Sequence, residues 1–393
     1  KRKMDSGYKT ALKFVVMLGL VSLFSDMTYE AARGINGSFL QKLGASGTAV
    51  GLVAGIGELI GYSLRFFSGY LADKTKKYWT ILIAGYLINL LSVPLLALAG
   101  FWQVAVILII AERTGKALRA PARDAVLSFG TEKTGRGWGY GLHEALDQIG
   151  AIAGPLLVSA VLFFRNQNYR MAYAVLAIPA LIAISLLLYC RYLYPRPGDL
   201  EIKKTGVSTK GFTKRYRIYL IAVILIAAGY ADFPLVAYHF KSESLMSDSA
   251  IPVFYAAAMA ADALAALVFG KLFDKLGIRV IIASVLLSSF FAPMVFAGGY
   301  GFALAGMILW GIGMGAQESV IKAEIAMMVP QEKRGTAFGT FNAAYGIFWF
   351  AGSAIMGFLY DKSVTGLIVF SVLTQLFAAS VLIFILKTEK RNE

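Results

Sequence analysis

Charged side chains are scarce in this chain. They make up 16% of its 393 residues, whereas 58% of the residues are hydrophobic. Soluble domains average about 25% charged and about 45–50% apolar residues. A water-soluble protein of this length has too small an interior to bury so much apolar surface. The composition therefore excludes a soluble globular protein and indicates a chain that crosses a lipid bilayer several times.

Cysteine and histidine are also nearly absent. Cysteine occurs once, as Cys190, and histidine twice. A single cysteine excludes an intrachain disulfide framework and a multi-cysteine metal site. The phosphate-binding pattern G-x4-G-K-[ST] is missing, and no nucleophile–base pair is evident. We therefore expect no enzymatic activity, no direct use of ATP, no cofactor and no resident metal.

The net charge of +15 raises the question of nucleic-acid binding. The basic residues, however, fall between apolar segments on one side of the membrane, with no interleaved aromatic patch. A basic cytoplasmic face is the ordinary explanation in a membrane protein. We expect no nucleic-acid partner, and we expect both termini to lie in the cytoplasm of a cell-membrane protein.

Twelve apolar segments are long enough to span a bilayer, which takes about 20 residues. They cover residues 12–40, 47–72, 79–99, 103–128, 137–163, 170–192, 217–240, 250–273, 279–299, 302–329, 336–358 and 365–386. The one sizeable loop, 193–216, is polar and basic. It divides the predicted all-helical membrane protein into two six-helix bundles, residues 1–192 and 217–393.

The two halves contain an internal repeat. GYLADKTKKY at 69–78 matches GKLFDKLGIR at 270–279, and GRGWGYGLHEAL at 135–146 matches KRGTAFGTFNAA at 333–344. The two matches have nearly the same offset along the chain. Such a spacing is typical of transporters built from two parallel repeats.

At these residues the sequence resembles the major facilitator superfamily. Its loop signature G-x-L-[GA]-D-[RK]-x-G-[RK]-[RK] is matched by Gly69, Leu71, Asp73, Lys74 and Lys77, with Lys76 in place of the internal glycine. A span-five signature of many proton antiporters, G-x8-G-x3-G-P-x2-G-G, is matched at four positions: Gly141, Gly150, Gly154 and Pro155. Val158 and Ser159 replace its terminal glycines.

The resemblance implies alternating access between two bundles, with spans one, four, seven and ten around a central cavity. It also implies a latch in which the loop acid meets bases of span four. The residues expected to act in gating are Gly69, Asp73, Lys74, Arg119, Arg123, Gly150, Gly154, Pro155, Gly270 and Asp274. Gly150 and Gly154 share a helix face that allows close packing in lipid, and Pro155 favours a bend.

Ionisable residues inside the spans are costly in a bilayer, so each is a functional hypothesis. Asp26, Glu30 and Arg33 share one face of span one, and Lys116 follows Glu112 by four residues on span four. Acids gathered in a desolvated cavity can exchange a proton near neutral pH. The proton-coupling candidates are Asp26, Glu30, Glu58, Glu112 and Asp147. The substrate-binding candidates are Arg33, Arg113, Lys116, His143, Glu144, Asp232, Asp262, Glu318, Asn342 and Tyr345.

The sequence thus indicates a secondary active transporter, and we expect a monomer that exports a small organic molecule in exchange for protons. Two alternatives stay open. The run His143-Glu144-x-x-Asp147 resembles H-E-x-x-H but lacks the second histidine. We therefore expect no hydrolytic zinc site, while transport of a metal cation stays an alternative. Arg33, Arg113 and Lys116 are equally compatible with import of an anionic solute.

Overall fold

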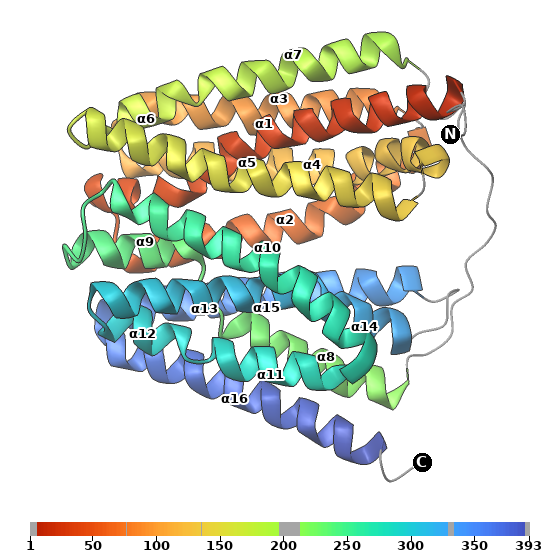
Figure 1. Cartoon of the computed structure of the whole chain (residues 1–393). Helices are drawn as coiled ribbons and strands as arrows, with labels where there is room; N and C mark the ends of the chain where they lie inside the picture. Colours follow the sequence, from red (N-terminus) through yellow and green to blue (C-terminus); the bar gives the residue numbers. More distant parts are fainter. Residues whose placement is uncertain (1–5, 76, 135, 196–212, 329–333, 390–393) are drawn as a thin grey trace. The chain divides into compact units, whose positions relative to one another are not determined.

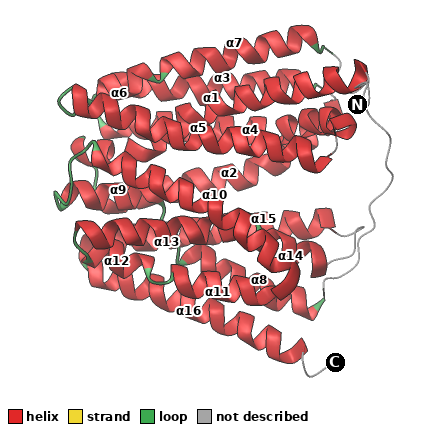
Figure 2. Cartoon of the chain, viewed as in Figure 1, coloured by secondary structure: helices red, strands yellow, loops and turns green. Residues whose placement is uncertain are grey.

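The computed structural model describes residues 6–75, 77–134, 136–195, 213–328 and 334–389. Throughout these ranges the regular structure is helical, with sixteen α-helices, one short 3-10 helix at Leu96–Leu98 and no strand (Figure 2). The predicted all-helical fold is confirmed.

The sixteen helices combine into twelve spans (Figure 1). Eight spans are single helices: α1 (Ser6–Lys42), α2 (Gly47–Thr75), α3 (Tyr78–Leu95), α4 (Trp102–Thr134), α5 (Arg136–Phe164), α10 (Ala250–Leu276), α15 (Arg334–Lys362) and α16 (Val364–Glu389). Four spans are interrupted: α6 (Tyr169–Val175) with α7 (Ala177–Leu193), α8 (Lys214–Ala228) with α9 (Phe233–Ser242), α11 (Ile278–Ser288) with α12 (Phe291–Ala297), and α13 (Tyr300–Glu318) with α14 (Val320–Met328).

Eleven of these spans are long and apolar enough to cross a membrane within the described residues. The exception is α4, which at 33 residues is about 50 Å long but carries a run of charges between Glu112 and Asp124. A helix of this length with charges at its centre is unstable in lipid by itself. Its charges must therefore be compensated by the helices that pack against it.

Residue contacts divide the chain into two compact units. Unit 1 contains residues 1–35 and 63–204, and unit 2 contains 36–62 and 205–393. In this division α1 and α2 each contribute to both units. The organisation into six-helix bundles 1–192 and 217–393 stays a prediction.

Three glycine contacts bring the helices of unit 1 close together. A Cβ added to Gly115 of α4 would lie 2.3 Å from the Asn89 nitrogen of α3. Added Cβ atoms at Gly150 and Gly154 of α5 would lie 2.2 Å and 2.3 Å from the carbonyl oxygens of Leu23 and Met27 of α1. Only glycine permits such approaches. The side chains of α1, α3, α4 and α5 are thereby held against one another.

Unit 2 is built around aromatic side chains. Trp310 and Tyr230 are fully buried, and the Trp310 indole N–H donates to the Ala231 carbonyl at 2.8 Å. This carbonyl belongs to the break between α8 and α9, where the Asp232 side chain caps α9 by accepting from the Phe233 amide at 2.8 Å. The break is therefore satisfied internally, as a bilayer requires.

Candidate functional site

The charges of α4 lie on the side of the helix that faces α1 and α5. Glu112, Lys116, Arg119 and Arg123 are spaced by four, three and four residues, so they follow one face over three turns. They meet acids from α1 and α5 in a series of ion pairs. We call this group the ion-pair ladder; its members are Asp26, Glu30, Glu112, Arg113, Lys116, Arg119, Arg123 and Asp147.

The first pair of the ladder joins α4 to α1. The Lys116 Nζ lies 3.5 Å from a carboxylate oxygen of Glu30. The same ammonium group lies 3.8 Å from the centre of the Tyr29 ring, one residue earlier on α1. The negative face of an aromatic ring stabilises such a cation by about 0.5–2 kcal/mol. Lys116 is thus held to α1 by a carboxylate and a π-face together.

Arg119 is the most deeply buried cation of the ladder, with 1% of its surface exposed. Its guanidinium carbon lies 4.3 Å from the ring centre of Tyr86 on α3 and 5.5 Å from that of Tyr29 on α1. Its Nη2 is 4.0 Å from an oxygen of Asp26, which is at the limit of an ion pair. The tyrosines therefore hold Arg119 in place, while its bond to Asp26 is loose.

The third pair involves α5. Arg123 Nη1 lies 3.6 Å from Asp147 Oδ2, and Arg123 Nη2 lies 3.0 Å from Asp124 Oδ1 on its own helix. His143, one turn before Asp147, places Nδ1 3.4 Å from the same Asp147 oxygen. The other ring nitrogen of His143 is 3.1 Å from the Ser22 hydroxyl of α1. Asp147 thus receives two partners at one oxygen.

Glu112 lies at the opposite end of the ladder and is held by α3. The Asn89 side-chain amide donates to the Glu112 carboxylate at 2.8 Å and to its backbone carbonyl at 3.1 Å. Arg113 Nε lies 3.5 Å from the second carboxylate oxygen. Asn89 is completely buried, so this carboxylate is fixed in position by a rigid neighbour.

The ladder is balanced in charge but incompletely bonded. Its four acids match its four bases when all are ionised. Yet one oxygen each of Asp26 and Asp147 is buried without a hydrogen-bond donor, as is the Arg119 Nε. A buried polar atom without a partner costs about 1–3 kcal/mol. The arrangement can therefore accept a proton at a carboxylate with little loss of bonding.

Several predicted site residues lie apart from the ladder. Glu144 is exposed on α5 and accepts from the Gln148 amide at 3.3 Å, so it does not join Asp147. Arg33 is half-buried on α1, one turn beyond Glu30. Glu58 groups with unit 2, where its charge and that of Glu318 act on the Tyr345 hydroxyl.

The remaining candidates of unit 2 do not form a comparable cluster. Asp232 acts as a helix cap, and Asp262 is buried on α10 where its backbone carbonyl abuts Gly315 of α13. Tyr345 donates to the Gln317 side chain at 2.6 Å. Glu318 is exposed and Asn342 is half-buried. These candidates of unit 2 therefore lie on several helices, among aromatic side chains.

The predicted gating residues have different surroundings. Gly150 and Gly154 contact α1 as described above, and Pro155 lies within α5. Gly69 faces Pro121 of α4 at an ordinary distance, Lys74 lies 5.8 Å from the Tyr70 ring, and Gly270 has open space beside it. The side chains of Asp73 and Asp274 and the burial of Gly141 are not described by the structure. The gating roles stay predictions.

Sequence reasoning missed the neutral residues that organise the ladder. Asn89, Tyr29, Tyr86 and Ser22 hold Glu112, Lys116, Arg119 and His143, respectively. The only available signal was Asn89, a polar residue in the otherwise apolar span 79–99. Among the described residues no group of three His, Cys, Asp or Glu side chains is placed to hold a metal ion.

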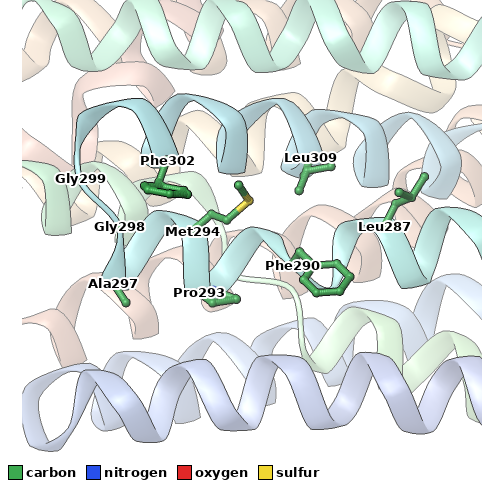
Figure 3. A pocket seen from close by; sticks show the side chains of 9 residues that line it. All are labelled: Leu287, Phe290, Pro293, Met294, Ala297, Gly298, Gly299, Phe302 and Leu309. Carbon is green, nitrogen blue, oxygen red and sulfur yellow. The ribbon is translucent and has the colours of Figure 1, made fainter.

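A separate hollow of about 640 Å³ lies in unit 2, between α11, α12 and α13 (Figure 3). Its lining is apolar and includes Phe290, Met294 and Phe302. Phe290 and Phe302 are 61% and 63% exposed, so the hollow opens on the apolar surface of the unit. It presents no ionisable side chain, and the ion-pair ladder is therefore the stronger functional candidate.

An all-helical polytopic fold with ion pairs between its spans is typical of membrane transport proteins. The chain belongs to the Major Facilitator Superfamily, whose family model matches residues 18–238 and 218–393. It is a multi-pass secondary transporter of this family and not an enzyme.

The relatives differ both in how much of the chain they match and in what their names say. The chain is 38% identical over 375 residues to the uncharacterized protein Rv2265 of Mycobacterium tuberculosis (strain ATCC 25618 / H37Rv), covering 94% of this chain and 92% of that one. A shorter similarity, 31% over 126 residues, covers 32% of this chain and 31% of the multidrug resistance protein MdtH of Proteus mirabilis (strain HI4320).

Solved structures match the fold over its full length. The crystal structure of the nucleoside transporter NupG superposes with a TM-score of 0.75 and covers 96% of this chain and 99% of that one. At 14% identity this likeness concerns the fold alone. It confirms the predicted twelve-helix fold of the superfamily.

Proposed function

We propose that this transporter is a proton-coupled exporter of a small organic molecule, working by alternating access. The observation that carries the proposal is the ion-pair ladder of unit 1, in which Asp26 and Asp147 are buried, loosely paired and incompletely hydrogen-bonded. A buried ion pair repays the cost of desolvating its charges only when its geometry is good and its remaining polar atoms are hydrogen-bonded. The antiporter-like glycines of α5 and the partial similarity to a multidrug resistance protein add support.

The ladder suits an exchange of proton and substrate because its charges balance. A proton bound at one carboxylate leaves one base without its partner, so the group gains a positive charge in a medium where charge is costly. Binding of a positively charged substrate beside the ladder adds a second positive charge and favours release of that proton. The proton gradient drives export if the outward-facing transporter favours the proton-bound state and the inward-facing transporter favours the substrate-bound state.

Asp147 is the carboxylate best placed to pass this event to the helices. It lies three residues before Gly150, whose backbone abuts Leu23 of α1, and Asp26 lies on the α1 turn between Leu23 and Met27. The loosely paired acids therefore flank the closest contact between α1 and α5. A change in their pairing acts directly where these two helices touch. We further propose a monomer in the cell membrane with both termini cytoplasmic.

The test begins with the substrate class. Purified protein is screened by thermal stabilisation against small organic cations, organic anions and divalent metal ions. Stabilisation by an organic molecule, followed by flux into proteoliposomes driven by an imposed pH gradient, supports the proposal. Stabilisation by metal ions alone, or flux indifferent to the pH gradient, refutes it and favours one of the alternatives.

Neutralising one acid then identifies the coupling group. In Asp147→Asn, gradient-driven flux is expected to fall at least tenfold while substrate exchange without a gradient persists. Glu243→Gln serves as the control, because Glu243 is an exposed acid at the end of α9 in unit 2. Equal loss of driven flux and exchange in Asp147→Asn points to damage of the fold and contradicts a coupling role.

A further inference from the structure

The chain contains only two histidines, and one of them lies inside the candidate coupling site. His143 is 3% exposed and has a partner at each ring nitrogen: Asp147 on its own helix and Ser22 on α1. Nδ1 is 3.4 Å from Asp147 Oδ2, and Nε2 is 3.1 Å from the Ser22 hydroxyl. We propose that the transported proton resides on His143, with Asp147 as its fixed counter-charge and Ser22 as the group that reports the change to α1. The inference rests on the proposed proton coupling and names its carrier.

The geometry determines which nitrogen takes the proton. A carboxylate only accepts hydrogen bonds, so in the neutral imidazole Nδ1 carries the hydrogen and donates to Asp147. Nε2 is then the acceptor, and the Ser22 hydroxyl donates to it. The incoming proton binds at Nε2. Nε2–H then donates to the Ser22 oxygen, and the bond to Asp147 becomes charge-assisted.

The Ser22 hydroxyl hydrogen must turn to another acceptor when His143 is charged. A serine inside a helix can donate to the carbonyl four residues earlier, which for Ser22 belongs to Leu18. Thr28 makes this bond on the same helix, donating to the Phe24 carbonyl at 2.7 Å. When His143 is neutral, the Ser22 hydroxyl donates to the ring; when His143 is charged, the ring donates to Ser22. The hydrogen bond between α1 and α5 is therefore reversed by protonation of His143.

Ser22, His143 and Asp147 are the residue types of a hydrolase triad, but their placement excludes that chemistry. Ser22 has no exposed surface, so no scissile bond can reach its hydroxyl. The hydroxyl is available only to the imidazole beside it. A buried Ser–His–Asp array can move a hydrogen and a charge, but it cannot attack a substrate.

The charges around His143 explain how its proton is coupled to α4. Among the described side chains, Asp147 faces His143 on α5, while Arg123 and Arg119 of α4 and Asp26 of α1 act on Asp147. Arg123 is shared between Asp147 at 3.6 Å and Asp124 at 3.0 Å. A positive charge on His143 satisfies Asp147 and repels Arg123 toward Asp124. Protonation at one ring therefore redistributes the ion pairs of two helices.

Imidazole is suited to this role because its ordinary pKa of about 6.5 lies within the physiological range. An adjacent carboxylate, here that of Asp147, favours the charged form of an imidazole ring. The protonation state of His143 is thus set by a residue on its own helix, and Asp147 is a positioning residue for it as well as a counter-charge.

The test is an NMR titration of the full chain in lipid nanodiscs, with histidine labelled by 13C and 15N. The signal absent from His143→Gln identifies His143, since only His239 remains. We expect the neutral His143 ring to carry its hydrogen on Nδ1 and the protonated ring to carry a second hydrogen on Nε2. In Asp147→Asn the midpoint falls by about one pH unit, a tenfold change in proton affinity. Glu144→Gln, which neutralises the nearest exposed acid, shifts the midpoint by less than a third of that amount.

A ring that stays neutral or stays charged from pH 5 to 9 overturns the inference, as does a midpoint unchanged in Asp147→Asn. The wild-type titration needs no variant, so misfolding of a mutant cannot conceal this outcome. Failure of the proposed function is a separate result: wild-type proteoliposomes then show no flux driven by a pH gradient. If driven flux is present but His143 does not titrate, proton coupling stands and its carrier is one of the ladder acids.

Discussion

The contact between Asp26 and Arg119 is the point at which the energetics of the ladder can be measured. The variants are Asp26→Asn, Arg119→Gln and the double variant, which together form a thermodynamic cycle. Each single change leaves a buried charge without its partner, because the Asp26 and Arg119 side chains are only 9% and 1% exposed. The double change removes both charges and keeps the approximate volumes.

The expected coupling follows from the separation and the surroundings. At 4.0 Å, two unit charges attract by about 4 kcal/mol with an effective dielectric constant of about 20. Loss of one partner from a buried pair costs about 3–5 kcal/mol. Tyr86 and Tyr29 continue to stabilise the Arg119 cation when Asp26 is neutralised. We therefore expect the double variant to be more stable than additivity predicts by about 2–4 kcal/mol.

The assay is equilibrium unfolding in mixed micelles of a mild detergent and dodecyl sulfate, monitored by tryptophan fluorescence. Asp124→Asn provides the control, because its pair with Arg123 is shorter, at 3.0 Å, but the Asp124 side chain is 58% exposed. Exposed pairs contribute about 0–1 kcal/mol. A coupling below about 1 kcal/mol for Asp26 and Arg119, or a larger cost for Asp124→Asn than for Asp26→Asn, would refute the reasoning that burial and not distance governs these pairs.

Two further variants test the helix contacts. Gly154→Ala places a Cβ 2.3 Å from the Met27 carbonyl oxygen, so α1 and α5 must separate by about 1 Å, and overpacking of this kind costs about 1–3 kcal/mol. A Cβ added at Gly61 of α2 has no neighbouring atom within 4 Å, so Gly61→Ala is expected to stabilise the folded protein by up to about 1 kcal/mol through helix propensity. Equal unfolding midpoints in Gly154→Ala and Gly61→Ala would contradict this. Asp361→Ala removes the carboxylate that accepts from the Thr48 amide at 2.7 Å and from its hydroxyl at 2.6 Å at the start of α2. The loss is expected to be about 1 kcal/mol, with Asp361→Asn retaining part of it, and identical unfolding of both variants and wild type would argue against a capping role.

Much of the fold was predictable because what the bilayer requires of a spanning segment can be read along the sequence. A span requires about 20 apolar residues in sequence, so hydropathy finds the spans without knowledge of any contact. The interruptions were not visible in this way. The span predicted at 217–240 is two helices, α8 and α9, since Asp232 and Pro234 together start a new helix within an apolar run.

The ladder was predictable in its members and not in its pairs. Helical periodicity placed Asp26 and Glu30 on one face, and the same reasoning placed Lys116 beside Glu112. In the structure Lys116 instead reaches Glu30 on α1, while Glu112 is held by Asn89 and Arg113. Neighbours on one helix compete with neighbours on the next, and only the packing of the helices decides which pair forms.

The sequence by itself determined the class of protein, the spans and the helix faces on which charge is buried, because each depends on composition or on local periodicity. The tertiary structure alone decided which cation faces which acid, which carboxylate oxygens are left without donors, and that His143 lies between Ser22 and Asp147. These features depend on the approach of α5 to α1 at Gly150 and Gly154, a contact between residues more than 120 positions apart in the chain. The proposed proton-coupling site depends on contacts between residues far apart in the sequence, and a sequence pattern does not show which of these contacts form.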